Sequence, residues 1–584
     1  MARRPHRACL SAATRTGASA AALLLCLYAP AGAGAAGSAI EILAGLEAQT
    51  LVRHPRADTF HLVQQRNTFR SRLVWDLGRR GAAFGLGDAR LTLAHRLTYD
   101  SVYDVVPTFR EHDLRGRKPG RLGTRDLGDL ADAARDAVKL EHQLREAYVD
   151  LRPARSPLRL RVGKQQIVWG EADFARILDR ANPLDLSWHG AQEIPPPAFG
   201  WDELRIPLWM LRLWWEVGRL GPLADVALEA YWNPGDWRPL RISYLPRPWG
   251  IRLQHPLTNR EDGAFHAPFT GIVRLAYGTS LFRQGRYRRH PGENSQLGLR
   301  LSAAMGEVRA SLLFFRQRWS GDDGTPVAPV RGIADTAAGR IETQRLIAHG
   351  SLPAEYVAPY VHTIGAAASW FDAAWTSATY RLETALDLGL PLFDRARATT
   401  LSPLLPGTTD RDYWKAVFAA DRGFALMPAG ADTLLFVTVQ ALVHHLIGST
   451  RTLTGPLDLP TVGRRGRPYC GAPPPEPCPD PDGNGSFRDD VRPWEMLLTL
   501  AAVAFLRGGT VVPVAGVALD PVNSYAANVF WSVDLAWSPR VSVNLAQRFF
   551  ISAQDDGQKG PFDPWHVGTQ RGRSETGLRI TYAF

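Results

Sequence analysis

Apolar and polar residues alternate one by one along several stretches of the chain. In the last ten residues, 575–584, every second side chain from Leu578 to Phe584 is apolar or aromatic, and those between are small or polar. The same alternation recurs at residues 90–99, 158–162, 296–302, 528–538 and 541–545. Successive side chains of a β-strand point to opposite faces. The pattern therefore predicts strands with one apolar and one polar face, and arginine recurs on the polar face, as at Arg96, Arg161 and Arg300.

The connections between these strands fall into two length classes. Short turns are predicted at 153–156, 219–222, 305–307, 371–373, 507–509 and 538–540, and most of them contain Gly or Pro, which suit tight turns. Long polar insertions lie at 101–140, 170–205, 234–294, 320–360 and 448–492. Short turns at one end and long loops at the other are typical of membrane barrels. We therefore predict an all-β fold, a transmembrane antiparallel β-barrel of about 16–18 strands.

A final strand that ends on an aromatic residue resembles the C-terminal signal of Gram-negative outer-membrane barrels. This resemblance implies insertion by the barrel-assembly machinery and contact with outer-membrane lipid and lipopolysaccharide. The 18 Trp residues fit the aromatic girdles of such a barrel. The alternative is a soluble protein, in which the last strand is the edge of a β-sandwich and the tryptophans bind glycans.

The N-terminus has the features of a secretory leader. Several arginines precede a short apolar run at 18–27, and small residues follow it as candidate cleavage sites. We assign residues 1–36 to a signal peptide and residues 37–584 to the barrel. Beyond the leader, no apolar run reaches the 18 residues that a membrane-spanning helix needs. The formal net charge of +11 includes four arginines of the leader and falls to +7 without them. That charge is small for a chain of this size, so it does not suggest nucleic-acid binding.

The most distinctive internal segment follows the strand that ends at Gly170. Residues 172–180 predict a short amphipathic helix, with Phe174, Ile177 and Leu178 on one face. Asn182-Pro183 would end this helix, because the residue before proline is disfavoured in the helical region. We expect residues 170–205, as a loop or short helix, to fold into the lumen of the barrel.

The residues around this segment also carry a family resemblance. The strand RVGKQQIVWG at 161–170, the motif Asn182-Pro183-x-Asp185, the strand entry RIPLWML at 205–211 and the preceding LREAYVD at 144–150 are similar to a family of Gram-negative outer-membrane proteins. That family is catalogued as a domain of unknown function and described as alginate-export-like or porin-like. The resemblance implies a barrel and does not imply a substrate. The Pro195-Pro196-Pro197 insertion departs from the common pattern.

The lumen loop carries charges of both signs. We expect these charges to form a constriction, since charged rings at a constriction make pores selective. The alternative is that they form structural ion pairs that anchor an outer loop. The candidate constriction residues are Glu171, Asp173, Arg176, Asp179, Arg180, Asp185 and Arg205.

The long loop at 447–493 holds two further candidate features. Cys470 and Cys478 lie close together, and an exported protein can oxidise such a pair, so we predict a disulfide rather than two free thiols. Asp480, Asp482 and Asn484, followed by Gly485, match the first half of an EF-hand loop, although Val491 stands where the bidentate Glu is expected. Calcium is thus a candidate ligand, and an ordinary polar turn is the alternative. No other cofactor is expected.

These features predict a non-enzymatic outer-membrane channel or transport component. It would pass small or amphipathic solutes, including anionic ones, by diffusion through a charged constriction. One alternative is an export conduit for a lipid or polysaccharide that works with periplasmic and inner-membrane partners. A barrel-borne lipid hydrolase is a minor alternative, because no Ser, His and acid set can be assembled from the strand faces.

Overall fold

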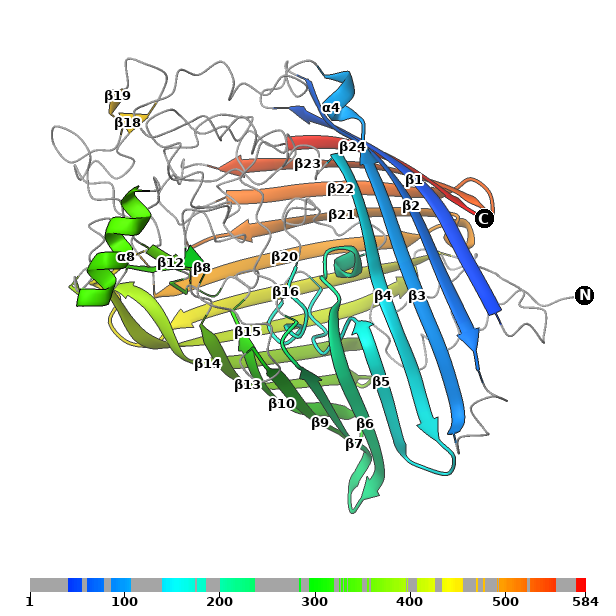
Figure 1. Ribbon diagram of the computed structural model, residues 1–584. Helices are drawn as coiled ribbons and strands as arrows, with labels where there is room; N and C mark the ends of the chain where they lie inside the picture. The colour runs from blue at the N-terminus through cyan, green and yellow to red at the C-terminus, as the bar shows by residue number, and fades with distance from the viewer. Residues whose placement is uncertain are drawn as a thin grey trace, which may run out of the picture.

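The computed structural model describes the chain in segments. These are residues 40–54, 60–77, 86–106, 139–173, 176–184, 200–236, 283–284, 294–319, 325, 327–328, 330–332, 335–348, 354–356, 359–394, 396–397, 407–425, 433–454, 469–470, 476–477, 491, 493–522, 526–552 and 574–584. Nearly all of the regular structure in these segments is β-strand (Figure 1). The predicted all-β fold is therefore confirmed.

Eighteen strands form one closed antiparallel barrel in which each strand pairs with its neighbour in the chain. The ring closes where Gly45 of the first strand pairs with Ala583 of the last. The strands are β1 (Ile40–His54), β2 (His61–Asp76), β3 (Leu86–Asp100), β4 (Leu140–Pro153), β5 (Leu158–Gln165), β6 (Leu208–Leu220), β7 (Leu223–Asn233), β9 (Gln296–Met305), β10 (Val308–Arg318), β13 (Tyr360–Asp372), β14 (Ala378–Asp394), β15 (Gly407–Ala425), β16 (Leu434–Leu446), β20 (Trp494–Phe505), β21 (Val511–Asp520), β22 (Ala526–Ala536), β23 (Val541–Ser552) and β24 (Ser574–Ala583).

The remaining described elements lie outside the ring or at its ends, except for the 3-10 helix Gly200–Glu203, which lies in the lumen. Five of the six small strands pair in two small sheets, and the sixth, β17, pairs with β14. Among the described residues, no helix has the length and apolarity that crossing a bilayer requires. These elements are α4 (Val102–Val105), α8 (Ala337–Ala348), the 3-10 helices η3 (Gly200–Glu203) and η5 (Arg507–Gly509), and strands β8 (Arg283–Gln284), β11 (Val330–Gly332), β12 (Ala354–Tyr356), β17 (Leu453–Thr454), β18 (Tyr469–Cys470) and β19 (Glu476–Pro477).

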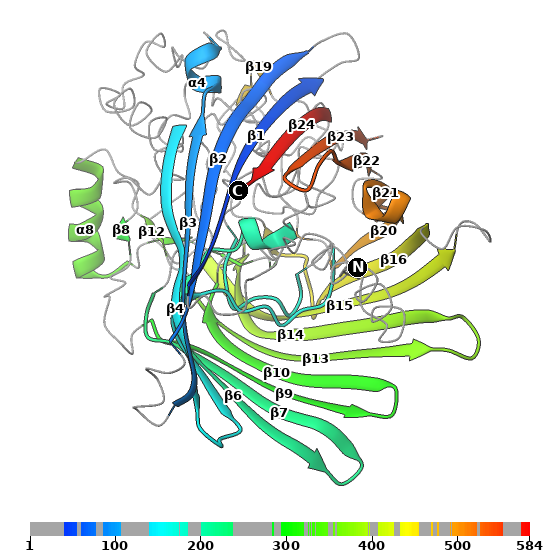
Figure 2. The same ribbon diagram turned by 90° about the vertical axis from the view of Figure 1, so that its right-hand side faces the viewer.

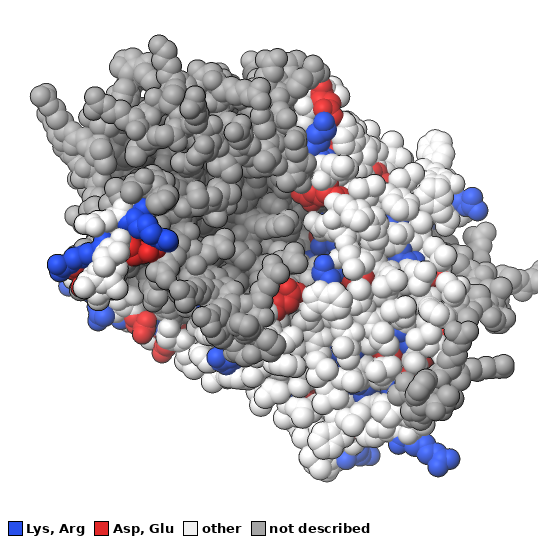
Figure 3. Space-filling view, viewed as in Figure 1, with Lys and Arg blue, Asp and Glu red and all other residues white. Residues whose placement is uncertain are grey.

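The predicted division between faces is also confirmed. On β24, Leu578 and Ile580 are more than 40% exposed and point outward, whereas Arg579 between them is 6% exposed and faces the lumen. On β3, Leu93 and Leu97 face outward, and Arg96 is buried inside. The outer surface over β3 to β6 is accordingly mostly uncharged in Figure 3. An apolar belt around a closed barrel is the surface that lipid requires.

Five of the six predicted short turns lie within one or two residues of the observed ones, which join β4–β5, β6–β7, β9–β10, β20–β21 and β22–β23. The sixth, predicted at 371–373, starts two residues and ends four residues before the β13–β14 connection at 373–377. We call this end of the barrel, which also holds the start of β1 and the finish of β24, the turn end. The opposite end is the loop end. The turn-end connections β2–β3 and β15–β16 were not predicted. They are longer, with nine and eight residues between the strands.

Candidate functional site: the segment that crosses the lumen

The chain enters the lumen after β5, which has only eight residues. Pairing between β4 and β5 stops at Ala147 and Lys164, although β4 continues to Leu140 at the loop end. Gln165 pairs with Leu208, so β5 and β6 end together part-way along the wall. We call residues 166–207 the lumen segment, and its described parts are 166–173, 176–184 and 200–207. Figure 2 shows this segment inside the ring of strands.

The neck of the lumen segment is held by Asn182, a fully buried residue of the Asn-Pro-x-Asp motif. Its amide oxygen accepts a hydrogen bond from the backbone N–H of Ile167 at 2.7 Å. Its amide nitrogen donates to the carbonyls of Gln165 at 3.1 Å and Ile206 at 2.9 Å. One asparagine side chain thus joins the outgoing and returning chains, since it has both donors and an acceptor. This contact gives the motif a structural role.

The predicted helix at 172–180 is wrong. The described residues of this stretch contain no helix, and among the described parts of the lumen segment only η3 is helical. Every residue from Arg176 to Leu184 is buried, including the charged ones that an amphipathic helix would have turned to water. Residues 176–184 are enclosed by protein, so their conformation is set by side-chain contacts within the lumen.

Apolar packing fixes one side of the lumen segment to the wall. Trp169 lies 5.2 Å from Phe315 and 5.3 Å from Tyr231, measured between ring centres. Two wall glycines make room for this packing. A Cβ on Gly298 would lie 2.9 Å from Trp169, and one on Gly365 would lie 2.3 Å from Leu178. The wall residues of this buried apolar cluster come from strands between β6 and β21, and they are Leu208, Met210, Tyr231, Leu313, Phe315, Ala385, Val417, Leu442, Leu497 and Ala518.

Charged groups of β14 and β15 bind the first part of the segment. Arg381 forms an ion pair with Asp173 at 2.5 Å and another with Asp421 of the wall at 2.7 Å. The carboxylate of Glu383 accepts hydrogen bonds from the backbone N–H groups of Glu171 and, at 2.9 Å, Ala172. Burial raises the pKa of Asp173 above its usual range, and the positive charge of Arg381 opposes that rise.

Arg180 extends the same contact toward β13. It pairs with Asp387 and donates a hydrogen bond to the hydroxyl of Thr363 at 2.9 Å. Lys415 is the second cation on Asp387, at 2.8 Å. Arg180, Asp387 and Lys415 are all nearly inaccessible to solvent. Because a buried charge is costly without a partner of opposite charge, removing one member of this network would destabilise the others.

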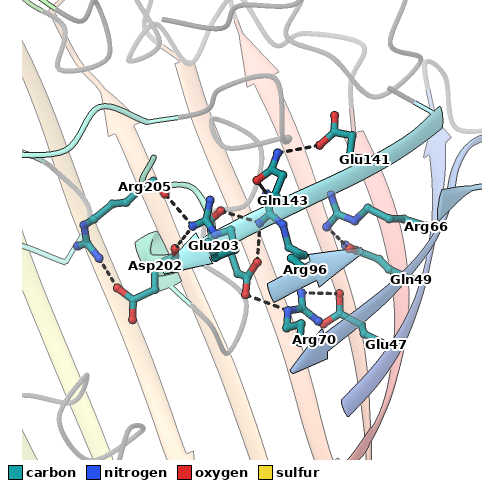
Figure 4. Close-up of polar contacts among 11 residues, drawn as sticks. Glu47, Gln49, Arg66, Arg70, Arg96, Glu141, Gln143, Asp202, Glu203 and Arg205 are labelled. Carbon is teal, nitrogen blue, oxygen red and sulfur yellow. Dashed lines mark hydrogen bonds and ion pairs between the residues drawn. The ribbon is translucent and has the colours of Figure 1, made fainter. Parts of the chain in front are cut away.

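The second part of the segment is bound by the opposite wall, at β2, β3 and β4 (Figure 4). Glu203 accepts hydrogen bonds from Arg70 at 2.9 Å and from Arg96 at 2.7 Å. Arg145 donates to the backbone carbonyls of Asp202 and Arg205, at 2.8 and 2.7 Å. Burial by itself would raise the pKa of Glu203, but the surrounding arginines outweigh it and hold that pKa well below its usual range.

Within the segment, Asp179 joins the two parts. Its carboxylate accepts from Arg205 at 2.6 Å and from Arg176 at 3.3 Å. Arg205 also pairs with Asp202, and the pKa of Asp202 is raised by burial against the opposing charge of Arg205. The segment is therefore a connected bar of ion pairs with apolar packing on one side.

This bar spans the lumen from wall to wall. β2 and β14 have eight strands between them in either direction around the ring, so they lie on opposite sides. The segment binds β2 and β3 through Glu203 and binds β14 through Asp173 and Arg180. An elongated link between opposite walls divides the bore at that level.

The predicted constriction residues are thus partly brought together. Glu171, Asp173, Arg176, Asp179, Arg180 and Arg205 all lie in the bar. Arg176 and Arg205 pair with Asp179 within the segment, whereas Asp173 and Arg180 pair with Arg381 and Asp387 of the wall. Asp185, Cys478 and the calcium candidates Asp480, Asp482 and Asn484 lie outside the described residues, so those expectations stay predictions.

Several residues of the site were not predicted. They are Asp202, Glu203 and the wall charges Arg70, Arg96, Arg145, Arg381, Glu383, Asp387, Lys415 and Asp421. Alternation in 378–394 would have placed Arg381, Glu383 and Asp387 on the polar face of one strand. It could not have identified their partners. In the described part of the chain, no group of three or more His, Cys, Asp or Glu is placed to hold a metal ion.

The fold and this site together define a class of protein, a transmembrane β-barrel whose lumen is crossed by one of its own loops. The chain belongs to the family described as "Protein of unknown function (DUF1302)", whose model matches residues 78–566. The predicted family resemblance is confirmed. No curated protein matches the sequence.

Solved structures that resemble the chain are bacterial outer-membrane proteins. OccAB2 of Acinetobacter baumannii has a TM-score of 0.40 and 9% identity, over 94% of this chain and 99% of its own. OccK1 of Pseudomonas aeruginosa has a TM-score of 0.38 and 10% identity, over 93% and 98%. OprB of Pseudomonas putida has a TM-score of 0.36 and 9% identity, over 94% of each chain.

Proposed function

We propose that this protein is an outer-membrane channel that passes small or amphipathic solutes, including anionic ones, by diffusion. The observation that carries the proposal is the bar of charged residues that crosses the lumen between β2 and β14, with apolar packing on one side. A constriction lined by charge selects solutes without covalent chemistry.

The solute path runs along the arc formed by β22, β23, β24 and β1. The apolar cluster beneath the lumen segment takes its wall residues from β6 to β21 and from none of these four strands. The strand registers place polar side chains on the lumen face of the arc. Those that are partly exposed are Asp534, Asn544, Arg548 and Thr581. A polar wall beside an apolar, filled half is the arrangement that keeps water in only one half.

Arginines on the inner wall favour anionic solutes. Arg72 on β2 faces the lumen, is exposed, and donates a hydrogen bond to the hydroxyl of Tyr148 at 3.4 Å. Positive potential in a narrow passage raises the local concentration of anions.

Cysteine labelling tests the path directly. In a background with Cys470 and Cys478 replaced by serine, Asn544→Cys places a thiol on the proposed path, and Ala385→Cys places one under the lumen segment, where Ala385 is 2% exposed. A charged methanethiosulfonate reagent should reduce single-channel current in the Asn544 variant and leave the Ala385 variant unchanged. Block of the Ala385 variant alone would place the path on the other side.

The role of the bar is tested by deletion of Glu171 to Glu203 and recording in planar bilayers. Larger conductance and weaker ion selectivity than in the wild type would support a constriction. A closed wild type and an open deletion would indicate a gated conduit that needs partners, as in an export system. Silence of both proteins would refute the channel.

A further inference from the structure

A second group of charged residues lies on the outer face of the barrel, at the loop end of β10. Leu313, Phe315 and Gln317 are buried and face inward, so Arg316 and Arg318 alternate with them and face outward. Arg318 pairs with Tyr360 in the register between β10 and β13. The guanidinium carbons of Arg316 and Arg318 lie 4.0 and 3.9 Å from the centre of the Tyr360 ring.

Neutral groups accept hydrogen bonds from both arginines. Arg316 donates to the carbonyl of Ser295 at 2.9 Å, and Tyr360 donates to the same carbonyl at 3.2 Å. Arg318 donates to the side-chain oxygen of Asn294 at 3.2 Å. In the described part of the chain, Arg316 has no acidic side chain within ion-pair distance. Its positive charge is therefore oriented and left without an ion-pair partner at the barrel surface.

Below the arginines, toward the turn end, the outer face is apolar. Leu312 is 63% exposed, Ile364 is 54% exposed, and Leu299 and Leu301 are 44% and 46% exposed. Leu312 is four residues from Arg316, which is about 13 Å along a strand. The surface thus has a cationic group at the rim and an apolar strip that begins about one headgroup length away. This arrangement fits a molecule that carries both a phosphate and acyl chains.

We propose that Arg316, Arg318 and Tyr360 bind the phosphate of an acylated outer-leaflet lipid of the lipid A type, whose acyl chains lie along Leu312, Ile364 and Leu299. Guanidinium groups form directed, charge-assisted hydrogen bonds with phosphate oxygens. The Tyr360 ring holds both guanidinium planes, so binding requires little ordering of these side chains. This site depends on the membrane barrel and is independent of whether the lumen conducts.

Binding is measured by native mass spectrometry of the refolded full-length barrel in detergent. The probes are lipid A, the same lipid after removal of its phosphates, and inorganic phosphate. The test variant is Arg316→Gln with Arg318→Gln. The matched control is Arg422→Gln, which removes an outward-facing arginine stacked on Phe424 at 4.7 Å near the turn end.

The affinity of the double variant for lipid A should fall at least about tenfold, which corresponds to the loss of one charge-assisted hydrogen bond. The control should bind lipid A like the wild type. Dephosphorylated lipid should bind weakly to all proteins, and millimolar inorganic phosphate should not displace lipid A. Lys at both positions should restore part of the binding. Equal lipid A binding by the double variant and the wild type would overturn the proposal, as would an equal loss in the control. Displacement by inorganic phosphate alone would identify a free-anion site instead.

Discussion

Replacing Glu203 by glutamine should release the end of the lumen segment that β2 and β3 hold. The carboxylate of Glu203 binds Arg70 at 2.9 Å and Arg96 at 2.7 Å, and its side chain is 17% exposed. Glutamine keeps the shape but loses the charge. A hydrogen bond that involves a charged group contributes about 1.5–3 kcal/mol. Arg70 keeps Glu47, and Arg96 keeps Gln143, so the wall itself should remain folded.

A loss of about 2–3 kcal/mol in docking free energy shifts the docked-to-released ratio by about 30- to 150-fold. Single-channel recording should show this as a large rise in the time spent at higher conductance. The control is Glu216→Gln, whose pair with Arg159 is 2.8 Å long but about half exposed. Such a pair contributes at most about 1 kcal/mol. If E203Q and E216Q gave the same currents, Glu203 would not anchor a constriction.

The pH dependence of this contact has a definite sign. Because the pKa of Glu203 is lowered in the folded protein, its contribution to docking is fully present above the ordinary carboxyl pKa of about 4.3. That contribution is lost only as the pH falls below this value. Acidification from pH 8 to pH 5 should therefore leave the Glu203 contact intact. Equal pH dependence of wild type and E203Q over this range would agree with this prediction, and a difference would contradict it.

Three further predictions concern other parts of the lumen. Asp387→Asn leaves Arg180 and Lys415 buried without their counter-charge, so the free energy of unfolding of the barrel should fall by about 3–5 kcal/mol. Heated SDS gels should show unfolding at a lower temperature, and an unchanged unfolding temperature would contradict this. Arg72→Glu should lower the anion-to-cation permeability ratio, read as a shifted reversal potential in a salt gradient, and an unshifted potential would count against a path past this wall. Because burial raises the pKa of Asp173, the docked segment takes up a proton more readily, so the occupancy of the higher-conductance state should fall as the pH is lowered toward the usual carboxyl range and should fall less in Asp173→Asn. A rise in that occupancy on acidification would contradict the predicted direction of the pH effect.

The family resemblance and the contacts of the motif support each other. In the sequence, the Asn-Pro-x-Asp motif is only a pattern that this chain shares with the family. The structure shows that Asn182 joins residue 167 to residue 206 and so fixes where the segment enters and leaves the lumen. A buried side chain that satisfies three backbone groups is costly to replace, because each of those groups would lose its partner. Asn182→Ala should therefore disorder the neck before it affects the wall.

The sequence alone determined the barrel, its two faces and the end at which the short turns lie. These follow from local rules, because alternation with a period of two and the length of each connection are both properties of neighbouring residues. Arg96, Arg161 and Arg579 could be placed on the inner face in this way. The entry of residues 170–205 into the lumen was predicted from their composition and position.

Only the tertiary structure decided what the lumen segment binds. Alternation assigns a face to Arg381, Glu383 and Asp387, but it cannot show that residues about two hundred positions earlier lie against them. The helix prediction failed for a related reason, since an amphipathic pattern assumes that the charged side faces water. Here the charged side faces the opposite charges of a barrel wall, and Arg176 and Asp179 are buried with the apolar residues. Which charges meet across the lumen depends on strand register and ring closure, and these are set by the whole chain.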